Sequence, residues 1–184
     1  SLNMAIGASH VGVRAMTGTS GGGFALMTEA VGEAAMTETP VVIVQAQRGG
    51  PSTGLPTKSE QADLFQLLGA SQGEFPKVII APRTLEECYR LTIHAFNLAD
   101  KYQCPILMAT DLYLAERLET FDGVNLNKIP IERGELVTQG NGKAYRRFLD
   151  TPTGVSPRAL PGTPGTVYTA ATDEHDEDGI VISD

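Results

Sequence analysis

A continuous run of largely β-branched residues, VVIVQA at Val41 to Ala46, constrains the fold of this chain more than any other feature. Both faces of such a strand are apolar, which is typical of a parallel strand buried between layers of helices. Further apolar runs at Lys77 to Ala81 and at Cys104 to Thr110 predict two more strands of this kind. A short strand is also expected at Val13 to Thr17.

Helical patterns separate the predicted strands. Small and apolar residues at helical spacing predict helices over residues 2–12, 24–36, 60–69, 85–102 and 111–118. Thr57 with Glu60, and Thr84 with Glu87, have the spacing of a capping box, which satisfies the first turn of a helix. The alternation predicts an α/β fold with three layers, in which helices cover both faces of a parallel sheet.

The sequence changes character at about residue 120. Residues 1–120 are interpreted as one α/β domain that is truncated at its amino-terminal end, because the chain starts within a helical pattern, SLNMAIGASH. Residues 121–184, called the extension below, are interpreted as a Pro/Gly-rich and acidic extension or linker toward the next domain. Within the extension, residues 129–137 can form one edge strand, and residues 172–179 suit a solvated loop better than a metal site.

Charge and cysteine content narrow the classes of partner. The 184 residues carry 14 Lys and Arg against 22 Asp and Glu, and no basic patch stands out, so nucleic acid is not an expected partner. No apolar run approaches the roughly 20 residues needed to span a bilayer, so no membrane partner is expected either. Cys88 and Cys104 are interpreted as reduced thiols, which fits a cytoplasmic protein.

The run TGTSGGGF at Thr17 to Phe24 has the composition of a phosphate-binding loop but not its spacing. No lysine follows Gly23, as the pattern GxxxxGK[ST] requires, and GTSGGG does not match GxGxxG. Three uses stay open: an anion at the start of the next helix, close approach of the backbone to a flat ligand or neighbouring subunit, or a tight turn without a ligand.

A second loop, from Gln45 to Thr57, contains an arginine directly after a predicted strand. The guanidinium of Arg48 suits bidentate capture of a carboxylate, and Ser52, Thr53 and Thr57 add hydroxyl donors. Because ligands of parallel sheets bind at the carboxyl ends of strands, both loops are expected at one rim. The alternative is an arginine on a mobile surface loop.

The segments NMAIGASHVGVRAMTGTSGGGF and QRGGPSTGLPTKSEQADL, which contain both loops, closely resemble the pyrimidine-binding domain of 2-oxoacid:ferredoxin oxidoreductases. The similarity is to the alpha subunit of the 2-oxoglutarate-type enzymes, and it continues through CPILMATDLYLAE, GVSPRALPGTPGTVY and EHDEDG. It implies part of a thiamine diphosphate enzyme that oxidatively decarboxylates a 2-oxoacid to an acyl-CoA, with 2-oxoglutarate favoured and ferredoxin as electron acceptor.

The resemblance also implies what other polypeptides supply. Thiamine diphosphate would be shared with a beta subunit or a diphosphate-binding domain, and magnesium and iron–sulfur clusters would lie on other subunits. Coenzyme A and ferredoxin would bind through the complex. Two family features, a YPITPS-like segment and a glutamate before the NMAIGA helix, should lie upstream of Ser1. We therefore expect no catalytic residue and no metal ligand in this fragment, and no activity of the fragment alone.

Roles for individual residues follow from the same resemblance. Arg48 would bind the substrate carboxylate, with Ser52 and Thr53 as polar neighbours. The glycine turn would line the pyrimidine side of the cofactor pocket or contact the partner domain, without holding phosphate. The residues of this turn are Thr19, Ser20, Gly21, Gly22 and Gly23.

Two other readings of the whole chain stay open, a transketolase-like thiamine enzyme and a non-catalytic α/β module that binds a small anion or serves in assembly. Among weaker candidates, Glu29 and Glu33 share one helix face and are interpreted as solvated. Asp111 can either cap a helix or reach the site. His10 and His94 are interpreted as surface or structural residues.

Overall fold

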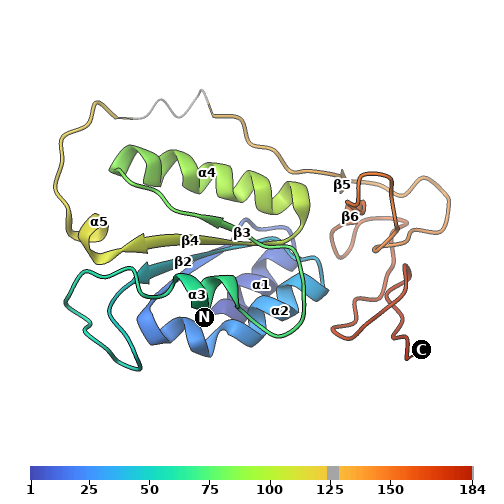
Figure 1. Ribbon diagram of the computed structural model, residues 1–184. Helices are drawn as coiled ribbons and strands as arrows, with labels where there is room; N and C mark the ends of the chain where they lie inside the picture. The colour runs from blue at the N-terminus through green and yellow to red at the C-terminus, as the bar shows by residue number, and fades with distance from the viewer. Residues whose placement is uncertain (124–128, 184) are drawn as a thin grey trace.

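Figure 1 shows the computed structural model, which describes residues 1–123 and 129–183. Its elements are, in chain order, α1 (Leu2–His10), β1 (Met16–Ser20), the 3-10 helix η1 (Gly21–Leu26), α2 (Thr28–Met36), β2 (Val41–Gln47), α3 (Leu64–Leu68), β3 (Val78–Ile80), α4 (Leu85–Tyr102), β4 (Pro105–Asp111), α5 (Leu112–Glu116), β5 (Leu136–Val137) and β6 (Arg158–Ala159). Four strands form one parallel sheet in the order β1-β2-β4-β3. Within these two ranges, every helix is too short or too polar to cross a membrane.

Helices cover both faces of the four-stranded sheet. Successive side chains of β2 point to opposite faces, so Ile43 packs with residues of α1, α2 and α3, whereas Val42 packs with residues of α4. Both side chains are fully buried. Figure 1 shows the same division, with α4 alone on one side of the sheet. The predicted α/β fold with three layers is therefore confirmed.

The pairing of the strands brings their carboxyl ends to one edge of the sheet. β2 pairs with β4 along its whole length, from Val41 opposite Pro105 to Gln47 opposite Asp111. β1 ends with Ser20 opposite Ala46. The glycines of the glycine turn follow β1, and residues 48–62, called the arginine loop below, follow β2, so both loops leave the sheet at this edge.

The first strand and the second helix differ from their predicted ranges. β1 covers Met16–Ser20 because it takes its register from β2, with Met16 opposite Val42, and the predicted strand at Val13 to Thr17 is three residues too early. The helix predicted over 24–36 is two elements, since η1 precedes an α-helix that begins only at Thr28. Gly21 has φ +53°, a left-handed conformation that favours glycine and turns the chain tightly before the helix.

The two predicted capping boxes have different outcomes. Residues 57–60 form a turn and irregular backbone, so the helix predicted from residue 60 begins later, at Leu64, and the first capping box is wrong. The second is confirmed in part, because the Thr84 hydroxyl accepts a hydrogen bond from the Glu87 amide at 3.1 Å. The carboxylate of Glu87 instead accepts from the Arg83 amide, at 2.8 Å.

The extension packs against the α/β domain beyond the amino ends of the strands (Figure 1). The edge strand predicted over residues 129–137 is wrong, because β5 pairs with β6 and not with the four-stranded sheet. Arg147, which is 3% exposed, donates to the carboxylate of Glu38 at 2.8 Å and to its carbonyl oxygen at 2.9 Å. The division of the chain at about residue 120 stays a prediction.

A buried carboxylate connects three distant segments of the chain. Asp100, near the end of α4, is 4% exposed. Its oxygens lie 2.8 Å from Arg14 Nε, 3.1 Å from Arg133 Nε and 3.6 Å from a terminal nitrogen of Arg158. A buried charge is costly unless it is paired, so these contacts connect the extension to both α4 and the segment after α1.

Candidate functional site

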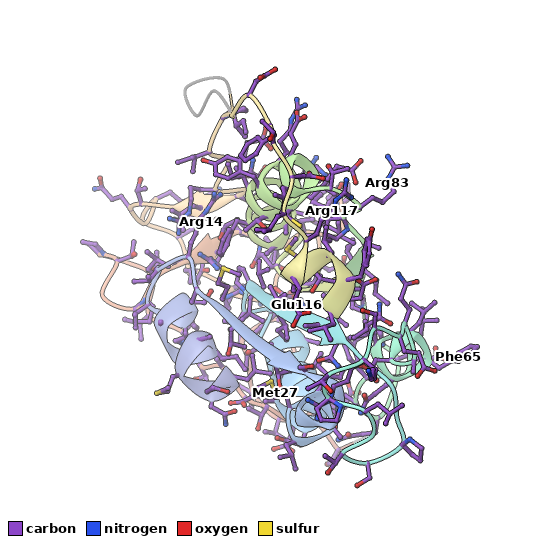
Figure 2. All side chains as sticks on the ribbon, turned by 90° about the vertical axis from the view of Figure 1, so that its left-hand side faces the viewer. Arg14, Met27, Phe65, Arg83, Glu116 and Arg117 are labelled. Atoms are coloured by element: carbon purple, nitrogen blue, oxygen red, sulfur yellow. The ribbon has the colours of Figure 1, made fainter. Side chains whose placement is uncertain are left out.

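The carboxyl ends of β1 and β2 border a cavity of about 830 Å³, called the rim cavity below. Residues predicted from the sequence line it, namely Gly21, Gly22, Gly23, Arg48, Ser52 and Thr53. Figure 2 views the molecule from this edge, with Phe65 of α3 pointing away from the fold. The two predicted loops therefore meet at one rim. The binding roles of their residues stay predictions.

The shape of the glycine turn follows from its contact with the arginine loop. A Cβ placed at Gly21 would lie 2.4 Å from Nε of Arg48, and one at Gly22 would lie 3.2 Å from the carbonyl oxygen of Ser52. The glycines therefore serve a steric purpose, since they let the second loop pack closely on the first. The turn continues into a 3-10 helix of six residues, and not into an α-helix whose dipole would attract phosphate.

The guanidinium of Arg48 has no carboxylate partner among the described residues. The side chain is half-buried, its stem packs on Gly21, and its Nε is buried without a hydrogen-bond acceptor. Glu60 and Asp63 also line the rim cavity, but neither forms an ion pair with Arg48 in the described parts of the chain. A cation without a counter-ion beside a cavity suits an anionic ligand, a carboxylate above all.

Gln45 and Asp63, which the sequence analysis did not select, connect the two loops. Gln45 is fully buried on β2, and its Nε2 donates to the carbonyl oxygen of Gly21 at 3.0 Å and to Oδ2 of Asp63 at 2.7 Å. The same Oδ2 accepts from the backbone amide of Arg48 at 3.4 Å. The one available signal was a glutamine inside the apolar run VVIVQA, because a buried amide needs hydrogen-bond partners.

Thr19 and Ser20, the remaining residues predicted for the glycine turn, are the last two residues of β1. The Ser20 hydroxyl donates to the carbonyl oxygen of Ala46 at 2.8 Å, which ties the end of β1 to β2. Thr19 contacts the other side of the turn, since a Cβ at Gly23 would lie 2.2 Å from its hydroxyl oxygen. Thr19, Ser20 and Thr57 are not among the residues that line the rim cavity in the described structure.

The weaker acidic candidates lie elsewhere. Glu29 and Glu33 of α2 line a separate cavity of about 650 Å³ beside the acidic loop of the extension. Asp111 caps α5, because its Oδ1 accepts from the Leu114 amide at 2.8 Å. Its Oδ2 accepts from Nε2 of Gln61, also at 2.8 Å. The capping interpretation of Asp111 is therefore confirmed.

The histidines and cysteines are outside the rim cavity. His94 is exposed on α4. His10 is half-buried, and burial, followed by the charge of Arg147, lowers its pKa. Both cysteines are free, and burial raises the pKa of the Cys104 thiol to about 11. Burial also raises the pKa of Cys88, so both thiols are mainly protonated at neutral pH.

Comparison with protein families gives a match over the whole chain. The model described as "Pyruvate flavodoxin/ferredoxin oxidoreductase, thiamine diP-bdg" matches residues 1–184. The alpha subunit of 2-oxoacid:ferredoxin oxidoreductase 1 from Sulfurisphaera tokodaii is 46% identical over 185 residues, which is 100% of this chain and 29% of that protein. The 2-oxoglutarate synthase subunit KorA from Methanothermobacter thermautotrophicus is 45% identical over 130 residues, 69% of this chain and 35% of that protein.

A solved structure shares the fold in detail. The 2-oxoglutarate:ferredoxin oxidoreductase from Magnetococcus marinus, with 2-oxoglutarate, coenzyme A and succinyl-CoA bound, aligns with a TM-score of 0.94 and 38% sequence identity. The alignment covers 100% of this chain and 32% of that chain. The present chain thus spans about a third of the length of these relatives.

Proposed function

Since this chain belongs to the pyruvate flavodoxin/ferredoxin oxidoreductase family, in its thiamine-diphosphate-binding part, we propose that it forms part of the alpha subunit of a 2-oxoacid:ferredoxin oxidoreductase. The complete enzyme oxidatively decarboxylates a 2-oxoacid to an acyl-CoA and passes the electrons to ferredoxin. Relatives named for 2-oxoglutarate support that acid as the substrate. A beta subunit or diphosphate-binding domain, with magnesium and iron–sulfur clusters, completes the enzyme.

The observation that carries the proposal is the position of Arg48 on the rim cavity. Its guanidinium is without a counter-ion in the described residues, and the hydroxyl-bearing residues Ser52 and Thr53 line the same cavity. Arg48 binds the carboxylate of the 2-oxoacid and fixes its orientation, while the hydroxyls donate to the remaining acceptor oxygens. The rest of the acid extends away from this contact.

The lining of the rim cavity fits one part of thiamine diphosphate. Exposed backbone at Gly22 and the half-exposed Gly23 leave room for a flat ring at this wall. A wall of bare backbone of this kind suits the flat aminopyrimidine ring of the cofactor. When bound, the cofactor supplies the electron sink for decarboxylation.

Replacement of Arg48 in the assembled enzyme tests the proposal. Charge-assisted hydrogen bonds contribute about 1.5–3 kcal/mol, so Arg48→Ala should raise KM for 2-oxoglutarate by about 10- to 100-fold. Arg90→Ala is the matched control, since Arg90 is exposed on α4 and, within residues 1–123 and 129–183, pairs only with Glu86 on its own helix. Equal KM values for the Arg48→Ala enzyme and the wild type would contradict the proposal. If kcat/KM of the wild-type enzyme is much higher for 2-oxoglutarate than for pyruvate, this would support 2-oxoglutarate as the substrate.

The isolated 184-residue chain should bind thiamine diphosphate only when its partner subunit is present, and it should turn over no 2-oxoacid. Titration calorimetry with and without the partner measures the first, and a ferredoxin-reduction assay measures the second. Anion binding by the isolated chain without cofactor binding in the mixture would instead favour a non-catalytic α/β module.

A further inference from the structure

Four residues form a closed ring of contacts at the rim cavity, and three of them, Gly21, Arg48 and Asp63, line it. Gly21 touches the side chain of Arg48, and the Gly21 carbonyl oxygen accepts from Gln45 at 3.0 Å. Gln45 donates to Asp63 at 2.7 Å, and Asp63 accepts from the Arg48 amide at 3.4 Å. The ring joins the glycine turn, β2, the arginine loop and the start of α3.

Two polar members of the ring, Gln45 and Asp63, are buried at positions where apolar side chains would need no hydrogen-bond partners. Gln45 is 0% exposed in the middle layer of the fold, and its Oε1 is buried without a partner in the described residues. A core glutamine with one unsatisfied oxygen weakens the core, so packing alone does not explain it. Its amide nitrogen, in contrast, makes two hydrogen bonds, and both connect elements of the rim cavity.

Asp63 does not cap the helix that it precedes. It occupies the N-cap position of α3, where an aspartate normally accepts hydrogen bonds from the first turn of the helix, yet its side chain makes no capping bond. Its Oδ2 accepts from Gln45 and from the amide of Arg48 instead. The carboxylate therefore fixes the backbone from which the Arg48 guanidinium projects.

We propose that Gln45 and Asp63 are positioning residues that hold Arg48 in the geometry needed to bind the 2-oxoacid carboxylate, an inference that rests on the function proposed above. They do not touch the substrate. They act on its binding only through the arginine. The loop from Gly49 to Ala62 is largely exposed, and the hydrogen bond from the Arg48 amide to Asp63, together with the packing of the Arg48 side chain on Gly21, anchors its start.

A double-mutant cycle in the assembled enzyme tests this inference. Asp63→Leu removes both acceptor contacts at similar side-chain size, and Asp63→Asn keeps them, because a single oxygen, Oδ2, accepts both hydrogen bonds. We expect Asp63→Leu to raise KM for 2-oxoglutarate by about tenfold, the size of coupling typical within one hydrogen-bond network. Asp63→Asn should remain within about threefold of the wild type.

The decisive measurement is Asp63→Leu in an Arg48→Ala background, where KM should not rise further. An equal rise in both backgrounds, or a lower melting temperature with KM unchanged, would overturn the inference. If Arg48→Ala alone leaves KM unchanged, the proposed function fails and the inference fails with it. If Arg48→Ala raises KM and Asp63→Leu does not, only the positioning role is refuted.

Two further variants serve as a second test and as a control. Gln45→Met has a similar length and donates no hydrogen bond, so it should reproduce the KM rise if the Asp63→Leu enzyme does not assemble. Asp173→Leu places the same substitution on an exposed loop of the extension and should leave KM unchanged. A normal KM for Gln45→Met in a well-assembled enzyme would contradict the proposed ring.

Discussion

Replacement of Gly21 with alanine would change two quantities at once, backbone strain and the position of Arg48. The residue has φ +53°, where an L-residue costs about 1–2 kcal/mol. The added methyl carbon would also lie 2.4 Å from Nε of Arg48. Because non-bonded heavy atoms pack at about 3.5 Å or more, the arginine side chain must move by about 1 Å.

A displacement of this size should break the contact proposed above between Arg48 and the substrate carboxylate. With about 1.5–3 kcal/mol for a charge-assisted hydrogen bond, we expect KM for 2-oxoglutarate to rise by about 10- to 100-fold. The free energy of unfolding should fall by about 1–2 kcal/mol from the backbone strain. Steady-state kinetics and thermal unfolding of the assembled enzyme measure the two effects.

Gly73→Ala provides the matched control for Gly21→Ala. Gly73 also has a left-handed backbone, at φ +74°, but a Cβ there would meet nothing within 4 Å. The Gly73→Ala enzyme should therefore lose a similar free energy of unfolding, while its KM for 2-oxoglutarate stays at the wild-type value. The reasoning is refuted if Gly21→Ala leaves KM unchanged, or if Gly73→Ala raises it by the same factor.

Three other predictions concern the packing of the chain. Arg147→Met removes the hydrogen bonds to Glu38 and should lower the free energy of unfolding by about 1–3 kcal/mol in urea titrations, and an unchanged midpoint would count against this contact. Because burial raises the pKa of Cys104 to about 11, iodoacetamide should alkylate it slowly at pH 8 in the folded chain and rapidly in urea, and fast labelling without urea would disprove its burial. Burial holds the pKa of His10 below its usual 6.5, so the unfolded chain binds more protons and stability falls as pH drops through and below about 6.5. His10→Gln should make the unfolding midpoint less sensitive to acidification, which an unchanged pH slope would contradict.

Much of the α/β domain could be predicted because its signals are local. The apolar run at Val41 fixed a buried strand, and the Thr84 hydroxyl marked the start of α4. The proximity of the glycine turn and Arg48 followed from the parallel sheet, which gathers the loops after β1 and β2 at one edge. These inferences needed only strand direction and side-chain periodicity.

Other features depend on contacts between residues far apart in the chain. The start of α2 was misplaced because the turn at Gly21, which packs against the side chain of Arg48, leads into a 3-10 helix before the α-helix begins. The capping box at Thr57 failed because the helix begins only after Asp63, whose carboxylate accepts hydrogen bonds from Gln45 and from the Arg48 amide. Such contacts between distant residues cannot be predicted from local sequence patterns.

The arginine cluster around Asp100 has a consequence for how this chain can be shortened. The Asp100 carboxylate, which is buried near the end of α4, pairs with all three arginines: Arg14, Arg133 and Arg158. Cutting the chain at residue 120 would remove Arg133 and Arg158. The remaining pair, Asp100 with Arg14, would then be more exposed to water. An expression boundary for this region should accordingly fall after Ala159, although the sheet itself is complete by Asp111.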